Sequence, residues 1–287
     1  MNHFPPKKIL VPFDLSTLSE TAWPQAVAFA RRFKSDLEVV YVQEWPSTEL
    51  VSLPPPELSA ETKRVLSKQI RATVGTAPKI TFIAGNPVRD ILRLARIHRT
   101  DLIFMGTHGR TGLTRALLGS VTEAVARQSP VPVMAVRGRG APIRSVLAPV
   151  NFTDYSYYGF THAAALAAGL GARLTALHVH VDPIWNGNPQ HKLAQLIEQL
   201  PSGIRENCQP LLETGESDAM RGILKAGARH DLIVLVAHEK APVKEMILGT
   251  TAERVLRHSP ASVLVVPAPR GALPTRKNLP TPCCATA

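Results

Sequence analysis

The stretch that decides the fold runs from Gly106 to Ser120 and reads Gly-Thr-His-Gly-Arg-Thr-Gly-Leu-Thr-Arg-Ala-Leu-Leu-Gly-Ser. The apolar residues 102–105 precede it, and residues 121–127, which have helical character, follow it. Glycines let the backbone approach an anion closely. The start of the next helix presents N–H groups and a positive dipole end at the same place. We therefore predict a phosphate-cradling turn between a strand and a helix, with Ser120 as the N-cap of the helix.

The spacing of the glycines, Gly-x2-Gly-x9-Gly-Ser, separates this stretch from two common phosphate loops. No lysine follows the last glycine, as a Walker loop requires, and the dinucleotide fingerprint is absent. The spacing resembles the ATP-binding motif of the universal stress protein family, and residues 9–16, 101–105 and 129–133 resemble that family too. A tight turn that holds no ligand is the alternative, but four segments in the right order favour a ligand.

Length and composition suggest a soluble chain of two domains. The chain has 287 residues, of which 45% are hydrophobic, enough for two packed cores. No apolar run approaches the ~20 residues of a membrane span, and residues 1–8 lack the apolar core of a secretory signal. We therefore expect a cytoplasmic protein with no membrane partner. The cysteines at 208, 283 and 284 give no disulfide or metal framework.

The formal net charge of +11 raises the question of nucleic acid or acidic lipid as a partner. The basic residues are scattered, without a long run and without interleaved aromatic residues. We therefore expect a solvated basic surface that attracts anionic nucleotides, and we do not expect nucleic acid as a partner.

Strands and helices are predicted to alternate through the first half of the chain. We expect strands at residues 8–12, 37–42, 79–83, 102–105 and 131–136, and helices at 19–33, 57–74, 86–98 and 120–128. Pro24 lies close to the start of the first helix, and the prolines of residues 46–57 indicate an extended loop. This alternation predicts an α/β fold with a doubly wound parallel sheet flanked by helices. The resemblance implies five strands in the order 3-2-1-4-5.

The pattern restarts after a linker at residues 138–142. Residues 145–153 echo residues 9–16, and Asp231 repeats Asp101 at an offset of 231 − 101 = 130, which also pairs Gly119 with Gly249. The chain is therefore predicted to hold two copies of one domain, at residues 1–138 and 143–267. Residues 268–287 have too few apolar residues to pack, so we expect a flexible and dispensable tail.

The two copies differ where a nucleotide would bind. The first-half residues and their second-half counterparts are Gly106 and Val236, Gly109 and Glu239, Arg110 and Lys240, Gly112 and Pro242, and Asp14 and Asn151. Side chains replace two of the close-approach glycines, and a glutamate would repel phosphate. We therefore predict one intact site, in the first half, and a second copy that keeps the fold with a degraded site.

The resemblance assigns the first site residue by residue. It implies that Pro12 and Asp14 line the nucleoside end, that Val42 contacts adenine through its backbone, and that the remaining residues surround the ribose and the phosphates. Those residues are Met105, Gly106, His108, Gly109, Arg110, Gly119, Ser120, Val121 and Thr122. The cofactor implied is ATP or a related adenine nucleotide, with Mg²⁺. His178 and His180 share a strand face but lack a fourth ligand, so we assign them a structural role and expect no metal site of their own.

The sequence thus predicts a stress-response protein whose first half binds nucleotide and whose second half is regulatory or structural. We assign no catalytic residue, and we leave slow ATP hydrolysis and autophosphorylation of Ser120 open. The alternatives are an interaction module that binds no nucleotide and a weak ATP hydrolase. The two halves are expected to pair as a pseudo-dimer through residues 131–136 and 262–266, since unpaired strand edges invite pairing. A further homodimer is left open.

Overall fold

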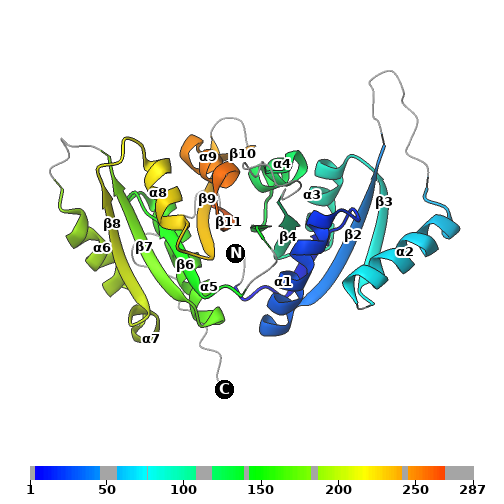
Figure 1. Cartoon of the computed structure of the whole chain (residues 1–287), viewed down its shortest axis with the longest axis horizontal. Helices are drawn as coiled ribbons and strands as arrows, with labels where there is room; N and C mark the ends of the chain where they lie inside the picture. Colours follow the sequence, from blue (N-terminus) through cyan, green and yellow to red (C-terminus); the bar gives the residue numbers. More distant parts are fainter. Residues whose placement is uncertain are drawn as a thin grey trace. The chain divides into compact units, whose positions relative to one another are not determined.

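The computed structural model describes residues 4–45, 57–75, 77–107, 118–138, 142–181, 187–240 and 245–268 (Figure 1). The chain divides into two compact units, one of residues 6–140 and one that begins at residue 141. Each unit is described by itself. None of the described helices is long and apolar enough to cross a membrane.

The first unit is a five-stranded parallel sheet with helices between successive strands. The strands pair in the order β3-β2-β1-β4-β5, which confirms the predicted order. Right-handed crossovers put α1 and α2 on one face and α3 and α4 on the other, because the chain reverses direction across the sheet after β3. The elements are β1 Lys8–Pro12, α1 Thr17–Phe33, β2 Asp36–Glu44, α2 Ala60–Val74, β3 Lys79–Gly85, α3 Pro87–Ile97, β4 Leu102–Gly106, α4 Ser120–Gln128 and β5 Val133–Val136.

The first helix begins earlier than the sequence indicated. Ser16 adopts an extended conformation and its side chain accepts a hydrogen bond from the Ser19 backbone, so α1 begins at Thr17. Pro24 therefore lies inside the helix instead of near its start. The cap explains the difference: an N-cap hydroxyl satisfies one of the first-turn N–H groups and fixes the helix start independently of the proline.

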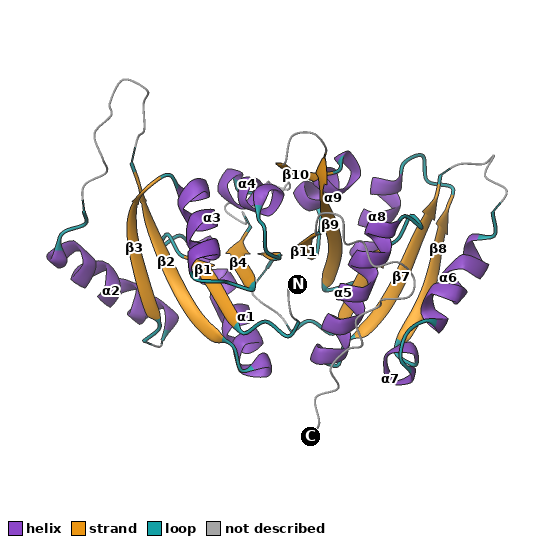
Figure 2. Ribbon diagram, turned by 180° about the vertical axis from the view of Figure 1, so that it is seen from behind, coloured by secondary structure: helices purple, strands orange, loops and turns teal. Residues whose placement is uncertain are grey.

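The second unit repeats the first, with one additional helix and with one strand whose counterpart falls mostly outside the described residues of the first unit. Its parallel strands pair in the order β8-β7-β6-β9-β11, the same 3-2-1-4-5 arrangement (Figure 2). The helix is the short α7, and the strand is β10, which pairs antiparallel with β9. The elements are β6 Ser145–Pro149, α5 Asp154–Leu170, β7 Arg173–His180, α6 Pro189–Glu198, α7 Ser202–Arg205, β8 Cys208–Thr214, α8 Ala219–Gly227, β9 Leu232–Lys240, β10 Glu245–Leu248, α9 Thr250–His258 and β11 Ser262–Pro267.

The repeat extends to individual hydrogen bonds at the amino edge of each sheet. Asp101 Oδ2 accepts from the backbone N–H groups of Lys7 and Lys8, at 2.8 and 2.9 Å. Asp231 Oδ2 accepts from the backbone N–H groups of Arg144 and Ser145, both at 2.9 Å. The residue before the fourth strand thus ties down the start of the first strand in both units.

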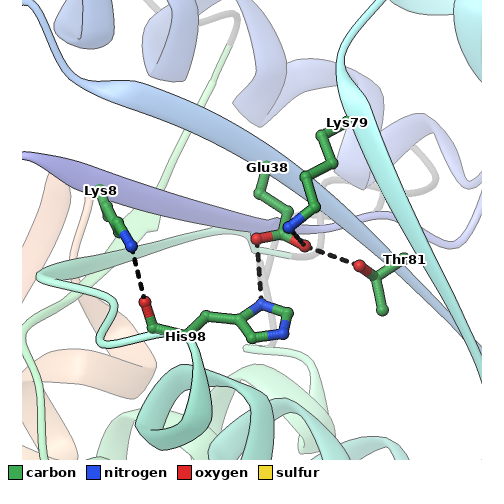
Figure 3. Close-up of polar contacts among 5 residues, drawn as sticks. All are labelled: Lys8, Glu38, Lys79, Thr81 and His98. Carbon is green, nitrogen blue, oxygen red and sulfur yellow. Dashed lines mark hydrogen bonds and ion pairs between the residues drawn. The ribbon is translucent and has the colours of Figure 1, made fainter.

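A polar cluster at the amino edge of the first sheet joins β2, β3 and the end of α3 (Figure 3). Glu38 Oε1 accepts from Thr81 Oγ1 at 2.6 Å and lies 3.2 Å from Lys79 Nζ, while Oε2 lies 3.0 Å from His98 Nδ1. Lys8 Nζ donates to the His98 carbonyl at 3.3 Å. Burial raises the pKa of Glu38, but the contacts with Thr81, Lys79 and His98 outweigh burial and hold the pKa below its usual value.

Candidate nucleotide site

The first sheet brings the ends of β1 and β4 together at its carboxyl edge. β1 and β4 are parallel neighbours, and β1 pairs with β2 on its other side, so the strand order reverses at this point. Parallel sheets bind ligands in the crevice at such a reversal. Pro12 ends β1, Gly106 ends β4, and Val42 lies near the end of β2. The fold therefore gathers the predicted residues of three strands at one edge.

The structure describes nine of the twelve predicted site residues. His108, Gly109 and Arg110 lie outside the described residues. Met105 is buried, at 5% exposed. The other described members are half-buried or exposed, except for Gly119 and Thr122, which are buried.

Asp14 lies in a turn that its own side chain stabilises. Leu15 has φ 60°, and Asp14 Oδ1 accepts from the N–H and the hydroxyl of Ser16 at 3.0 and 2.5 Å. Partial burial raises the pKa of Asp14, but hydrogen bonds from Ser16 and Ser19 outweigh it, so the pKa lies below its usual value. The Asp14 carboxylate is therefore charged at neutral pH.

The second unit makes the same turn without the charge. Asn151 Oδ1 accepts from the N–H and the hydroxyl of Thr153 at 3.3 and 2.7 Å, and Phe152 has φ 61°. An amide oxygen thus accepts the two hydrogen bonds of this turn just as a carboxylate oxygen does. The negative charge of Asp14 is not required by the turn and remains available to a ligand or cation.

Two threonines fix the chain where β4 ends. The hydroxyl of Thr122, in the first turn of α4, donates to the Gly106 carbonyl at 2.9 Å. The N–H and hydroxyl of Thr107 both donate to the Val136 carbonyl, at 3.0 and 2.8 Å. The Thr122 hydroxyl is thus committed to the backbone, and its contribution to an anion would come from its N–H.

Gly119, and not Ser120, is the N-cap of α4. Gly119 has the extended conformation of a cap, φ −63° and ψ 137°, and its carbonyl accepts the first helical hydrogen bond from Glu123 at 2.9 Å. Ser120 is the first helical residue and is exposed. Because glycine has no side chain, the N-cap residue itself gives the first-turn N–H groups no side-chain hydrogen bond. The prediction of Ser120 as a cap was wrong, and the second unit has the same arrangement, with Gly249 as the N-cap of α9.

The second unit builds a hairpin where the first has its glycine-rich stretch. β9 continues to Lys240 and pairs antiparallel with β10, with Ala237 opposite Leu248 and Lys240 opposite Glu245. Residues 228–248 contain no glycine to interrupt the extended chain. The sequence did not predict this extension of the strand, although it did predict that the second site is degraded.

Side-chain packing under the two sites also differs. A Cβ built on Gly159 would lie 2.4 Å from Val236 Cγ2, so Val236 occupies the space above that glycine. The equivalent residues of the first unit are Ala22, in α1, and Gly106. The first unit thus has the larger residue on the helix and glycine on the strand, whereas the second unit has glycine on the helix and the larger residue on the strand. The second unit therefore accommodates a valine at the end of its fourth strand only because α5 carries a glycine.

His178 has a structural environment, in line with the role assigned to it. Its Nδ1 donates to the Val150 carbonyl at 2.9 Å, and its ring packs against Phe152 with ring centroids 4.5 Å apart. Burial lowers the pKa of His178. Across the described ranges there is no group of three or more His, Cys, Asp or Glu side chains that could hold a metal ion.

Sequence reasoning missed two polar residues at this edge, Thr107 and Arg137. Thr107 follows β4 and Arg137 follows β5. The signal that could have found them is the same offset of 130, at which the second half carries Ala237 and Pro267.

Comparisons with known proteins agree on the family. A family model described as "Universal stress protein family" matches residues 5–137 and 142–267. A universal stress protein of Methanocaldococcus jannaschii is 33% identical over 143 residues, 46% of this chain and 82% of the relative. A universal stress protein of Mycobacterium tuberculosis is 32% identical over 136 residues, and this match covers 45% of each chain.

A solved structure shares the fold over most of the chain. The universal stress protein from Archaeoglobus fulgidus aligns with a TM-score of 0.71 at 24% identity, covering 92% of this chain and 99% of that one. At this identity the likeness speaks for the fold alone. The family match covers both units, and the chain therefore belongs to the universal stress protein family.

Proposed function

We propose that the first unit binds ATP or a related adenine nucleotide at the carboxyl edge of its sheet. The observation that carries the proposal is the start of α4, which has Gly119 as its N-cap and which the Thr122 hydroxyl ties to the end of β4. N–H groups and a helix dipole directed at one place favour a phosphate. The stretch between these two elements is rich in glycine, which suits a close approach of the ligand.

The second unit supports the proposal by contrast. It has the same sheet, and its turn at Asn151 matches the turn at Asp14. At the positions of the glycine-rich stretch, however, the second unit has the β9–β10 hairpin, and Val236 replaces Gly106. The second unit keeps a glycine N-cap, Gly249, at the start of α9, but the glycine-rich stretch, the Asp14 carboxylate and the Thr122 hydroxyl belong to the first unit alone. We propose that the second unit is structural or regulatory and binds no nucleotide.

Mg²⁺ fits the donor set of the first unit as a companion of the nucleotide. Asp14 offers one ionised carboxylate beside the reversal of strand order. Mg²⁺ in nucleotide sites is held by one or two carboxylates together with the substrate phosphates, so a single carboxylate suffices. The ion would neutralise phosphate charge and orient the phosphate chain, and Asp14 would position it.

The nucleotide is proposed to act as a conformational ligand in a stress response. A ligand that binds one conformation better than another shifts the population toward it, which can change the choice of partner. Slow hydrolysis would instead need a base held near the phosphates, and autophosphorylation would need the exposed Ser120 hydroxyl. Incubation with ATP distinguishes these reactions from simple binding: hydrolysis would produce ADP, and autophosphorylation would produce phosphoserine.

The test is the nucleotide carried by the purified chain. Protein is denatured by heat and the supernatant is analysed by mass spectrometry, for the natural chain and for Gly106→Val, which copies the second unit. We expect an adenine nucleotide from the natural chain and none from the variant. If neither released nucleotide nor added ATP binds the folded natural chain, the interaction module that binds no nucleotide is the correct function.

A further inference from the structure

Helix α3 carries its basic residues on one exposed face. The helix packs against β2 and beside α4, and the side chains of its other face are buried. Arg89, Arg93 and Arg96 are exposed and are spaced four and three residues apart, so they share one side of the helix. Arg99, just after the helix, is exposed as well. Basic residues that look scattered in the sequence thus gather on one surface, which we call the α3 basic face.

Acidic side chains neutralise little of this face. Asp90 is the one acidic residue of α3, and it is buried, at 3% exposed. Its carboxylate accepts from Arg89 Nη2 at 3.1 Å and from Arg93 Nε at 3.2 Å, and these two arginine side chains remain 64% and 52% exposed. Within the part of the chain that the structure describes, Arg96 and Arg99 form no ion pair. The face therefore presents more positive charge than its own carboxylate balances.

The helix dipole does not explain the arrangement. A basic residue in the last turn suits the negative end of a helix, and Arg96 lies there. Arg89, however, lies in the first turn, at the positive end, where the dipole disfavours a cation. The face as a whole is therefore not accounted for by stabilisation of its own helix.

An exposed isoleucine lies within the basic face. Ile97 is 61% exposed, the most exposed large hydrophobic side chain among the described residues. It follows Arg93 by four residues, so it lies one turn further along the same side of the helix. Protein interfaces combine apolar area with arginine, whereas contacts with a phosphate backbone depend on charge and gain nothing from an isoleucine. Ile97 therefore favours a protein over a nucleic acid as the partner of this face.

The matching helix of the second unit, α8, has no such surface. The N-caps Asn86 and Asp218 give the offset, 218 − 86 = 132. Residues of the face and their counterparts are Arg89 and Arg221, Arg93 and Lys225, Arg96 and Ala228, and Ile97 and Arg229. Lys225 Nζ lies 3.0 Å from a Glu213 oxygen and 3.2 Å from a Glu216 oxygen, so acidic side chains neutralise part of α8. The apolar residue within the face belongs to the first unit and is not required by the repeated fold.

We propose that the α3 basic face docks an acidic segment of a partner protein, with carboxylates on the arginines and an apolar side chain on Ile97. The excess of guanidinium groups over the single buried carboxylate of Asp90 sets the sign of the partner's charge. Opposite charges across an interface steer the encounter and select the partner. Contact with Ile97 adds a contribution that salt does not screen.

The experiment measures the binding of fluorescent probes to the full chain by anisotropy, without added nucleotide. The first probe is a peptide of about twelve residues, all glutamate except for one central leucine, which spans ~18 Å as a helix. The second probe carries serine in place of the leucine. Single-stranded RNA of similar charge is the third probe and represents the alternative partner.

Two pairs of substitutions remove the same charge from different helices. Arg96→Gln with Arg99→Asn changes the face and leaves the contacts of Asp90 in place; asparagine is chosen because residue 99 has φ 54°. Arg64→Gln with Arg71→Gln is the matched control on α2, which covers the other face of the sheet. Both control residues are exposed, and Arg71, like Arg96, lies in the last turn of its helix. Melting curves check that each variant is folded.

The expected result is a loss confined to the face. Arg96→Gln with Arg99→Asn should weaken binding of the leucine peptide about tenfold or more, and the α2 control less than about twofold. Ile97→Ser should weaken binding of the leucine peptide about threefold or more and leave the serine peptide unchanged. RNA should bind less tightly than the leucine peptide.

Four results would overturn the inference. Equal weakening by the two pairs would show that the peptide follows net charge alone. An Ile97→Ser variant that binds both peptides like the natural chain would remove the apolar contact. Tighter binding of RNA, lost in Arg96→Gln with Arg99→Asn, would assign the face to nucleic acid. A natural chain that binds neither peptide would refute the docking surface and leave the proposed nucleotide site unaffected.

Discussion

The two units differ in side-chain size at two facing positions, one on the first helix and one at the end of the fourth strand. Ala22 and Gly106 occupy in the first unit the places that Gly159 and Val236 occupy in the second. Val236 fits because Gly159 leaves room for it, whereas the first unit carries the larger, buried Ala22 at the matching position of α1. A valine at the end of β4 therefore requires a compensating change on the facing helix.

This exchange predicts a coupled pair of substitutions. Gly106→Val alone should lower the free energy of unfolding by about 1–3 kcal/mol, since it overpacks a filled space. Ala22→Gly alone should cost about 1 kcal/mol through backbone entropy. The double variant should be more stable than the sum of the two losses by about 1 kcal/mol or more. Urea denaturation of the four full chains measures this coupling; strictly additive losses would show that the two residues do not meet.

The second unit carries Asn151 at the position of Asp14, so the substitution Asp14→Asn copies the second unit into the first. Asp14→Asn should keep the turn, because Asn151 makes the same two hydrogen bonds. We expect the free energy of unfolding to change by less than about 0.5 kcal/mol. The affinity for ATP with Mg²⁺ should fall about tenfold or more, since a charge-assisted contact is lost. Calorimetry with and without Mg²⁺ checks this, and unchanged Mg²⁺ dependence would remove Asp14 from the cation site.

At the scale of elements, the Glu38 cluster holds two strands to the end of a helix. Its carboxylate is 16% exposed and contacts Lys79, Thr81 and His98. Because these contacts lower the pKa of Glu38, the carboxylate stabilises the fold at pH values above its unfolded pKa. That stabilisation is lost as the pH falls through the lower, folded value.

The matching prediction compares Glu38→Gln with the natural chain across pH. At pH 7 the variant should be less stable by about 1 kcal/mol. The difference should shrink as the pH falls below about 4.3, the usual pKa of glutamate. Urea midpoints at neutral and acid pH measure it, and Glu57→Gln, in the exposed approach to α2, is the control. A difference that stays constant down to pH 3 would mean that the charge of Glu38 contributes nothing.

Elements whose ends carry local signals were predictable from the sequence. β1 and α4 have the predicted bounds, and Asn86 caps α3 just ahead of Pro87. Two features depend on tertiary structure and were missed. α1 accommodates Pro24 in its interior, and β9 extends into a hairpin with β10. Propensity cannot foresee these, since packing against the sheet and pairing with a neighbouring strand provide the stabilisation.

For the whole molecule, the internal repeat was the most informative property of the sequence. It predicted two copies of one fold and identified the copy with the intact glycines, and the described residues of the second unit form a hairpin in place of that stretch. It did not reveal that Gly119 is the N-cap of α4, because Ser120 looks like a cap until the conformation of Gly119 is known. The predicted tail lies, apart from Ala268, outside the described residues.

The pairing of the two halves through residues 131–136 and 262–266 stays a prediction. β5 and β11 end the strand order of their own sheets, and such edges favour pairing with another strand. In a chain whose native cysteines are replaced by serine, Met134→Cys with Leu264→Cys should form an intrachain disulfide on oxidation. A control with Met134→Cys and Glu20→Cys, an exposed residue of α1, should not. Crosslinking of neither pair would count against edge-to-edge pairing.

The central claim is that nucleotide binds once per chain, in the first unit, and calorimetric titration of the full chain with ATP and Mg²⁺ tests it most directly. We predict one site per chain, lost in Gly106→Val and kept in Gly249→Ala. The second variant is a fair control because Gly249 has φ −59° and a Cβ there would meet nothing within 4 Å. Two equivalent sites per chain, or full binding by Gly106→Val, would contradict the account.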